Sequence, residues 1–295
     1  MTLFTISIFS LNLPYRGKQG PHVRIISLKK RRLSRCKCRF NLNWNKDFVM
    51  KRNIFFVCFV ILLTVQTLYA LTGREIMEKS DDLPEPQTAM SKLLMLVYKG
   101  DRVEEKEFTL QMKKYPDDED KTLIAFIRPT QINLLTHARK GVDDDQWLRL
   151  SSGRIKRIVS ADKGKPFVNS HFYYQDLSSR DIDEYEYELL GEAKAVGEDC
   201  YTIQGIKIMG EKVYDKLIFY VRQSDYFVVR IDFYKDGEFH KFLENHQVRE
   251  IDGILTPYKV AMERADGKGK TELMLQGVKY NADIADMTFN KDALR

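Results

Sequence analysis

The stretch that decides the fold is KLIFYVRQSDYFVVRIDFYKDGEFHKFLENHQVREI, residues 216–251. It contains three apolar, aromatic-rich runs of the kind that favour strands. The residues between them, Gln223-Ser224-Asp225 and Lys235-Asp236-Gly237, favour tight turns. Strand-like runs joined by short turns of this type predict a meander of three antiparallel strands.

The same pattern continues in both directions from this stretch. Further strands are predicted at Met90–Tyr98, Val103–Lys114, Thr122–Arg128, Ile132–Ala138, Gln146–Leu150, Arg154–Val159, Tyr185–Glu192, Asp199–Ile208, Leu255–Ala265 and Thr271–Tyr280. Predicted helix is scarce, and its best signal is the capping box Thr72-Gly73-Arg74-Glu75, which opens a helix ending near Ser80. Ten or more short strands in one chain predict a single domain, residues 71–295, built on one large curved sheet or barrel.

The basic character of the chain is confined to its N-terminal part. Residues 1–70 hold 13 Lys or Arg and one acidic residue, Asp47, whereas the remainder holds 35 basic and 41 acidic residues. A mildly acidic body gives no electrostatic reason to expect a nucleic-acid partner.

The segment MKRNIFFVCFVILLTVQTLYA, residues 50–70, has the layout of a secretory signal peptide. A short basic region precedes a twelve-residue apolar run, Ile54 to Val65, and a small residue, Ala70, stands at the expected cleavage point. The alternative is a transmembrane anchor, but the run is shorter than the roughly 20 residues that a spanning helix needs. We expect a soluble periplasmic protein, with residues 1–49 either an extension upstream of the true start at Met50 or a disordered basic tail.

The cysteines are consistent with export without disulfides. Cys36, Cys38 and Cys58 precede the expected cleavage point, so Cys200 alone remains after it. A pairing within the mature chain is therefore excluded.

Motifs for catalysis or metal binding are missing from the sequence. It contains no G-x-S-x-G, H-E-x-x-H or C-x-x-C, and its histidines are scattered. His240 and His246 have even spacing on one predicted strand, but a solvated strand face explains them better than a metal site. The acidic clusters, such as Asp143-Asp144-Asp145, are expected in turns and lack the spacing of an EF-hand calcium loop. We therefore expect no enzyme, no cofactor and no bound metal.

The apolar content of the predicted strands is the most informative feature that remains. Runs such as SKLLMLVY and YFVVRIDFY would give the sheet one apolar face, which must be covered. Either side chains fill the interior as an ordinary core, or a sheet this wide is only partly covered and keeps a cavity for an acyl chain. The pattern alone leaves both alternatives open.

Several segments in succession give the chain a family resemblance. LTGREIMEK (71–79), DDDQWLRLSSGRIKRI (143–158), SADKGKPFVNSHFYYQDLSSRDIDEY (160–185), LLGEAKAVGEDCYTI (189–203), YKDGEF (234–239) and DMTFNKDAL (286–294) occur in the order found in the outer-membrane lipoprotein-sorting, or LolA-like, proteins. The chain departs from the family pattern at Arg149, where an aromatic residue is usual, and at Gly153.

The resemblance implies an incomplete antiparallel β-barrel, a half-barrel with short covering helices and an apolar cavity. It also implies a periplasmic carrier that binds lipid acyl chains and takes part in lipoprotein or lipid sorting, with an inner-membrane exporter or an outer-membrane acceptor as partner. The alternative is a non-carrier binding or sensor module, or an exporter accessory protein, of the same fold. Cavity-lining candidates are the large apolar strand residues Leu94, Leu96, Phe126, Leu148, Leu150, Phe172, Ile203, Phe219, Val229, Phe233, Met262 and Met274.

The stretch DDDQWLRLSSGRIKRI is predicted to form a hairpin around Ser151-Ser152-Gly153. Alternation places Leu148 and Leu150 toward the interior, with Trp147 and Arg149 on the other face. The bases Arg149, Arg154, Lys156 and Arg157 are expected to form one outer patch for membrane headgroups or a protein partner.

Overall fold

The computed structural model describes residues 71–116, 119–210 and 212–294. Thirteen antiparallel strands form one open sheet in the order β6-β5-β4-β3-β2-β1-β13-β12-β11-β10-β9-β8-β7. The strands are β1 Thr88–Lys99, β2 Arg102–Tyr115, β3 Glu119–Arg128, β4 Asn133–Arg139, β5 Val142–Arg149, β6 Ile155–Ile158, β7 Tyr185–Ala195, β8 Glu198–Lys207, β9 Lys216–Arg222, β10 Val228–Lys235, β11 Glu238–Ile251, β12 Ile254–Arg264 and β13 Lys270–Tyr280. The predicted mainly β half-barrel is confirmed, and the meander at residues 216–251 forms β9, β10 and β11.

Helices are short and few in the described residues. They are α3 Gly73–Asp81, α4 Ser160–Lys163, and the 3-10 helices η1 Phe167–Asn169, η2 Tyr174–Leu177, η3 Ile182–Glu184, η4 Asp286–Phe289 and η5 Lys291–Leu294. The predicted capping box is present, because the Thr72 side chain accepts from the Glu75 backbone and the Glu75 side chain accepts from the Thr72 backbone. No helix within the described ranges is long and apolar enough to cross a membrane. Residues 1–49 and the expected signal peptide, 50–70, lie outside them.

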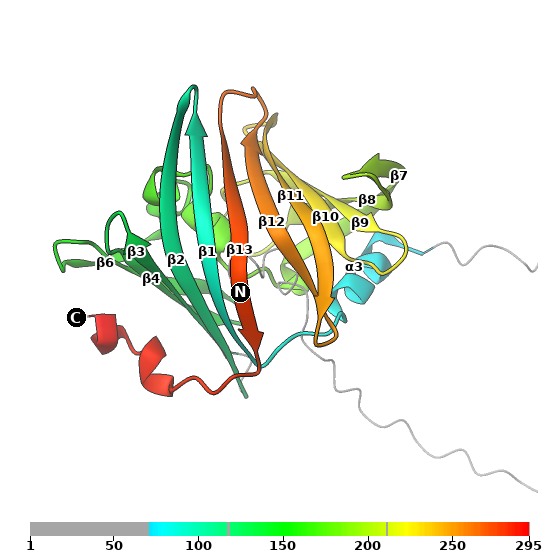
Figure 1. Ribbon diagram of the computed structural model, residues 1–295. Helices are drawn as coiled ribbons and strands as arrows, with labels where there is room; N and C mark the ends of the chain where they lie inside the picture. Colours follow the sequence, from blue (N-terminus) through cyan, green and yellow to red (C-terminus); the bar gives the residue numbers. More distant parts are fainter. Residues whose placement is uncertain (1–70, 117–118, 211, 295) are drawn as a thin grey trace, which may run out of the picture. The chain divides into compact units, whose positions relative to one another are not determined.

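The two faces of the sheet differ in what covers them (Figure 1). Along β2, Phe108, Leu110 and Met112 are buried on the inner face, while the alternate positions point outward. Residues 160–184, named here the covering segment, lie across this inner face and connect β6 to β7. The covering segment contributes Phe167, Phe172 and Leu177 to the core, and all three are fully buried.

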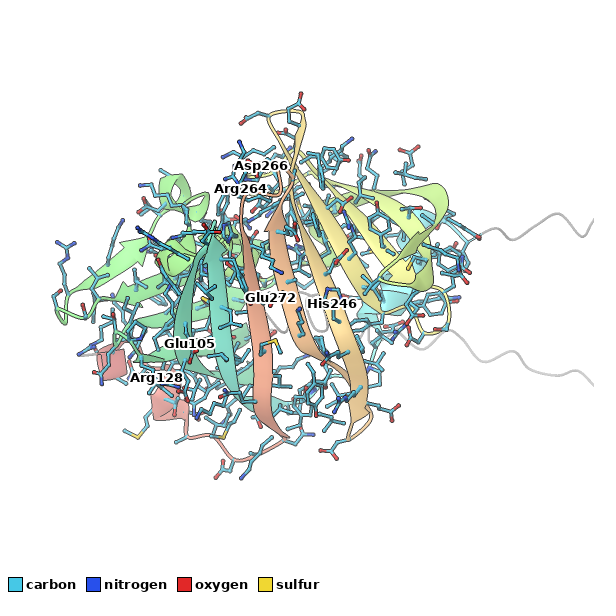
Figure 2. The ribbon with its side chains drawn as sticks, turned by 45° about the horizontal axis from the view of Figure 1, so that its top comes forward. Glu105, Arg128, His246, Arg264, Asp266 and Glu272 are labelled. Atoms are coloured by element: carbon cyan, nitrogen blue, oxygen red, sulfur yellow. The ribbon has the colours of Figure 1, made fainter. Side chains whose placement is uncertain are left out.

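The last residues of the chain build a second, smaller core on the outer face. Ile284, Phe289 and Leu294 pack with Leu135 of β4. Partly buried side chains from neighbouring strands, among them Trp147, complete this outer core. The rest of the outer face is dominated by charged and polar side chains, such as Glu105, Glu272 and His246 (Figure 2).

Three of the predicted cavity-lining residues belong to the outer face. Leu94 pairs with Met274 across β1 and β13, and Leu96 lies two positions further along β1. In both strands the buried positions are the alternate ones, Leu93 and Leu273 among them. Leu94, Leu96 and Met274 are therefore directed away from the interior, because neighbouring residues of a strand point to opposite faces.

The aspartates 143–145 also differ from the expectation, because they lie within β5 and not in a turn. Asp144 points inward and is buried, while Asp145 points outward. A carboxylate at a buried strand position needs hydrogen-bond donors, and the covering segment provides them.

The first helix packs closely against β7, the strand at one end of the sheet. A Cβ atom added to Gly73 would lie 2.7 Å from the backbone nitrogen of Leu189 in β7. Only glycine therefore allows α3 to approach the backbone of β7 this closely.

Candidate functional site

The candidate site is the apolar interior between the concave face of the sheet and the covering segment. Eight of the twelve predicted lining residues are buried there. They are Phe126, Leu148, Phe172, Ile203, Phe219, Val229, Phe233 and Met262. Aromatic contacts join the sheet to its cover, since the ring centroids of Phe126 and Phe167 are 5.7 Å apart. Phe167, Phe172 and Leu177 of the covering segment are buried in this interior.

The β5–β6 hairpin forms as predicted, but it divides the expected basic patch between two faces. Leu148 points inward, while Leu150 follows the end of β5 and is half-buried. Lys156 pairs with Leu148 across the hairpin, whereas Arg157 pairs with Trp147 on the outer face. Arg149 is also on the outer face, and Arg154 is exposed in the turn. The four bases therefore do not form one patch, because β6 alternates between faces.

Two of these four bases are already neutralised. The Lys156 amine lies 2.5 Å from the Asp162 carboxylate, and the Arg157 guanidinium lies 2.5 Å from the Asp145 carboxylate. The basic residues left for a partner on the outer surface are therefore Arg149, Arg154 and Arg157, of which Arg157 already forms an ion pair with Asp145.

A buried ion pair fastens the covering segment to the sheet. The Nζ of Lys241, in β11, lies 2.5 Å from Oδ2 of Asp176, in η2, and both side chains are almost completely inaccessible to solvent. Lys241 also donates to the carbonyl of His171, at 3.0 Å. Asp176 accepts from the hydroxyl of Tyr214, at 2.6 Å, and from the backbone nitrogen of Tyr173, at 2.7 Å. Because the remaining lone pairs and protons find partners, the charges are tolerated inside an apolar region.

Further polar contacts hold the covering segment along its length. Asp144 of β5 accepts from the backbone nitrogen and hydroxyl of Ser179, at 2.6 and 2.7 Å. Lys106 of β2 donates to the carbonyl of Val168 at 2.9 Å. The covering segment is thus attached by apolar packing at its centre and by charged or polar anchors from several strands.

Two histidines stand where the covering segment meets the sheet. Nδ1 of His171 lies 2.8 Å from the hydroxyl oxygen of Thr271, in β13, and Nε2 of His240 lies 2.8 Å from the hydroxyl oxygen of Tyr173. The pKa of His171 is lowered, first by burial and then by the positive charges of Arg264, Lys99 and Lys241. The pKa of His240 is lowered by burial and by Lys241, Lys235 and Arg264, against a smaller opposing effect of Asp176.

These shifts predict that acidification weakens the attachment of the covering segment. A histidine with a lowered pKa binds fewer protons in the closed, folded state than when exposed, so its contribution is lost as the pH falls below the ordinary value of 6.5. Hydrogen exchange of backbone amides in residues 160–184 should therefore be faster at pH 5 than at pH 7, after correction for the intrinsic pH dependence of exchange. The double variant His171→Gln/His240→Gln should lose most of this difference, and an undiminished difference would contradict the assignment.

The polar anchors could not be predicted from the sequence. Lys241 and Asp176 are separated by 65 positions, and neither stands in a recognisable motif. A weak signal was present in the sequence. Lys241 lies two positions before Leu243, so the two side chains share the buried face of β11.

His240 and His246 lie in different surroundings on β11. His240 contacts the covering segment, whereas His246 lies on the outer face beside Glu244, at 3.3 Å. Among the described residues, no three His, Cys, Asp or Glu side chains gather in a way that could hold a metal ion.

Solved structures of known proteins share this architecture of an open sheet with a covered concave face. An outer membrane lipoprotein-sorting protein domain from Vibrio parahaemolyticus is 26% identical, with a TM-score of 0.71 over 75% of this chain and 97% of that chain. A DUF1329 family protein from Desulfovibrio piger is 27% identical, with a TM-score of 0.72 over 76% of this chain and 98% of that chain. A LolA superfamily protein from Nitrosomonas europaea, 20% identical with a TM-score of 0.61, covers 76% of this chain and 100% of that chain and supports the fold.

These similarities define the class of protein as one with the lipoprotein-sorting fold. A family model described as "-like: Uncharacterized protein" matches residues 118–295, and no curated protein gives a significant match. The chain belongs to the family of this model, and its fold is that of the LolA-like lipoprotein-sorting proteins.

Proposed function

We propose that the protein is a periplasmic carrier that binds lipid acyl chains between the concave face and the covering segment. It would thereby take part in sorting lipoproteins or lipids to the outer membrane. The observation that carries this proposal is a wide apolar sheet face closed by a segment with little regular structure, whose attachment includes polar and charged anchors. When the segment lifts, the polar and charged groups of these anchors can form hydrogen bonds to water instead. The side chains of a fully apolar attachment could not do so.

The mechanism is an exchange of apolar groups. Phe167, Phe172 and Leu177 of the covering segment occupy the interior in the closed state. On loading, acyl chains take their place against inner-face residues such as Phe126 and Phe219. Each CH2 group removed from water contributes about 0.8 kcal/mol, so one long acyl chain offsets the loss of several side-chain contacts.

Delivery of the protein to the periplasm rests on the signal peptide expected at Met50–Ala70. Transfer requires a donor and an acceptor, and an inner-membrane exporter and an outer-membrane receptor fit these roles. The surface around Arg149 and Arg154 on the β5–β6 hairpin is a candidate for contact with one of them.

The filled interior also favours a second candidate function, that of a binding or sensor module that never carries lipid. The two functions differ in whether the covering segment opens for a ligand. Native mass spectrometry of the mature protein purified from the periplasm of its host distinguishes them. The carrier predicts bound lipid or acylated protein, whereas a uniformly empty protein that also takes up no lipid from vesicles would contradict it.

A further inference from the structure

The two ends of the curved sheet approach one another beside the covering segment. β5 and β8 are each the second strand from an end of the sheet. A Cβ atom added to Gly210, in the loop between β8 and β9, would lie 2.9 Å from Oδ1 of Asp143 in β5. The amine of Lys163, in the covering segment, lies 3.9 Å from the same oxygen. Both ends of the sheet and the covering segment therefore border the interior at this place.

Apolar side chains are exposed at this place. Val142 directly precedes Asp143, and Ile208 and Met209 directly precede Gly210. The exposed fractions of Val142, Ile208 and Met209 are 49%, 47% and 47%. We name these three residues the apolar rim. Single exposed apolar side chains are ordinary, but a group of them marks an interaction surface.

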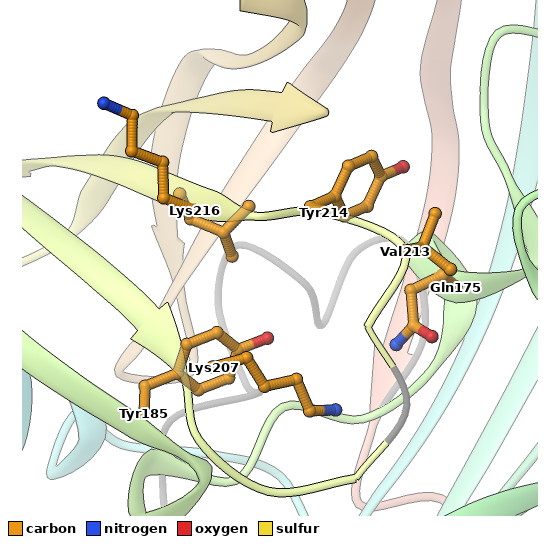
Figure 3. Close-up of a pocket in the computed structure, with 7 residues that line it drawn as sticks. Gln175, Tyr185, Lys207, Val213, Tyr214 and Lys216 are labelled. Atoms are coloured by element: carbon orange, nitrogen blue, oxygen red, sulfur yellow. The ribbon is translucent and has the colours of Figure 1, made fainter. Parts of the chain in front are cut away.

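The apolar rim does not enclose a ligand pocket. Figure 3 shows Lys207 and Val213, which flank the apolar residues of the β8–β9 loop, around a small space that Gln175 of the covering segment also lines. That space has room for about one water molecule. A partner therefore contacts the apolar rim from outside.

The charged side chains next to the apolar rim are paired with one another. The Lys140 amine lies 3.4 Å from the carboxylate of Asp183, and the Lys207 amine lies 3.0 Å from the carboxylate of Glu184. Paired charges attract neither a strongly acidic nor a strongly basic partner. The contact that the apolar rim can make is therefore mainly apolar.

A lipid bilayer is the partner that fits this surface best. The three exposed side chains are aliphatic, whereas the residues that dominate binding between proteins are most often tryptophan, tyrosine and arginine. Aliphatic side chains partition into the acyl region of a bilayer, and paired charges remain at the level of the headgroups. The covering segment, beneath which acyl chains are proposed to enter, borders the apolar rim through Lys163, Asp183 and Glu184.

We propose that the apolar rim inserts into the surface of a lipid bilayer and holds the adjoining border of the covering segment against the membrane. The proposal rests on the carrier function proposed above and adds the surface through which the protein meets the membrane. Three half-exposed side chains bury too little apolar area for stable anchoring, so the binding is reversible. A carrier that moves between two membranes requires reversible binding.

The test is binding of the mature protein to phosphatidylcholine vesicles, which carry no net charge, measured by co-sedimentation. Ile208→Ser/Met209→Ser should weaken binding about 30-fold, because burying each half-exposed side chain contributes roughly a factor of five. Raising the salt concentration from about 50 to about 500 mM should change wild-type binding less than about twofold, because the charges are paired. Val103→Ser/Met287→Ser is the matched control. It alters side chains that are 53% and 73% exposed outside the apolar rim, and it should bind as the wild type does.

A fluorescent label provides a second measurement that does not depend on a loss of binding. Cys200 is buried and is the only cysteine that follows residue 70, so Met209→Cys and Val103→Cys can each be labelled with an environment-sensitive fluorophore. Vesicles should shift the emission of the label at residue 209 to shorter wavelength and leave the emission of the label at residue 103 unchanged.

Equal binding of Ile208→Ser/Met209→Ser and the wild type would overturn the proposal, as would no binding of the wild type to phosphatidylcholine vesicles. Binding to native inner-membrane vesicles but not to pure lipid would also overturn it, because the apolar rim would then contact a protein. Uptake of a fluorescent fatty acid from solution tests the carrier function separately. Ile208→Ser/Met209→Ser should take up this probe as the wild type does, whereas no uptake by either protein would contradict the carrier function itself.

Discussion

Replacing Asp176 by alanine should lower the free energy of unfolding by about 3–5 kcal/mol, the range found when one partner of a buried ion pair is removed. Lys241 would keep its charge in a site where its side chain is only 2% exposed. Burial already lowers the pKa of Lys241, with Asp176 as the main opposing influence. Loss of the carboxylate therefore removes the group that keeps the amine protonated. Chemical denaturation at pH 7 measures the change.

The double variant Asp176→Leu/Lys241→Met should regain most of the lost stability, because replacing a buried pair by apolar residues of similar size is often neutral. Asp266→Ala is the matched control. It removes an exposed ion pair with Arg264, of length 2.7 Å, and should leave stability nearly unchanged. A small effect of Asp176→Ala, equal to that of the control, would show that the buried pair does not hold the covering segment.

Replacing Phe289 by alanine should also cost about 3–5 kcal/mol, as is usual for a buried phenylalanine. Phe289 is 1% exposed and lies in the outer core with Leu135, Ile284 and Leu294. The nearby Trp147 packs against this core and is the sole tryptophan of a chain that begins at Leu71. Its fluorescence should shift to longer wavelength as the tail loosens.

Met287→Ala provides the control for the tail, because Met287 lies in the same 3-10 helix but is 73% exposed. It should change neither stability nor the tryptophan emission appreciably. If Phe289→Ala matched this control in both measurements, the C-terminal residues would not form part of the folded core.

The strands were predictable because their local signals agree. At residues 216–251, apolar runs and turn residues both indicate a meander, and the structure contains it. The capping box at Thr72 was predictable for the same reason, since all of its atoms lie within four consecutive residues. Features that depend on short-range pattern are the ones that sequence alone defines well.

Which side chains of β1 point to the inner face could not be predicted from the residues of β1 alone. SKLLMLVY is apolar at odd and even positions, so alternation does not distinguish Leu93 from Leu94. The neighbouring strand carries the missing information, because Phe108 and Leu110 alternate with Thr109 and Gln111. The pairing of Leu93 with Phe108 then defines the inner face, but this register is a property of the folded sheet.

The polar anchors and the outer core escaped prediction for a related reason. Asp176 and Lys241 read as ordinary charged residues, and only the crossing of the covering segment over β11 brings them together. Likewise, Leu135 lies on the face opposite to Leu134, and it is buried only because the tail returns to cover it.

If acyl chains enter between the covering segment and the sheet, a covalent bond that prevents the segment from moving should block their entry. His171 and Thr271 are suitable sites for an engineered disulfide, because the backbone nitrogen of His171 lies 3.0 Å from the Thr271 hydroxyl. Cys200 is buried and is the only cysteine that follows residue 70. The two single-cysteine variants are the controls.

The measurement is uptake of a fluorescent fatty acid by His171→Cys/Thr271→Cys, before and after reduction of the disulfide. We expect the oxidised protein to take up little or no probe. Reduction should restore uptake to the level of the single variants, and the backbone amides of residues 160–184 should then exchange hydrogen faster. Equal uptake by the oxidised and the reduced protein would show that acyl chains do not enter beneath the covering segment.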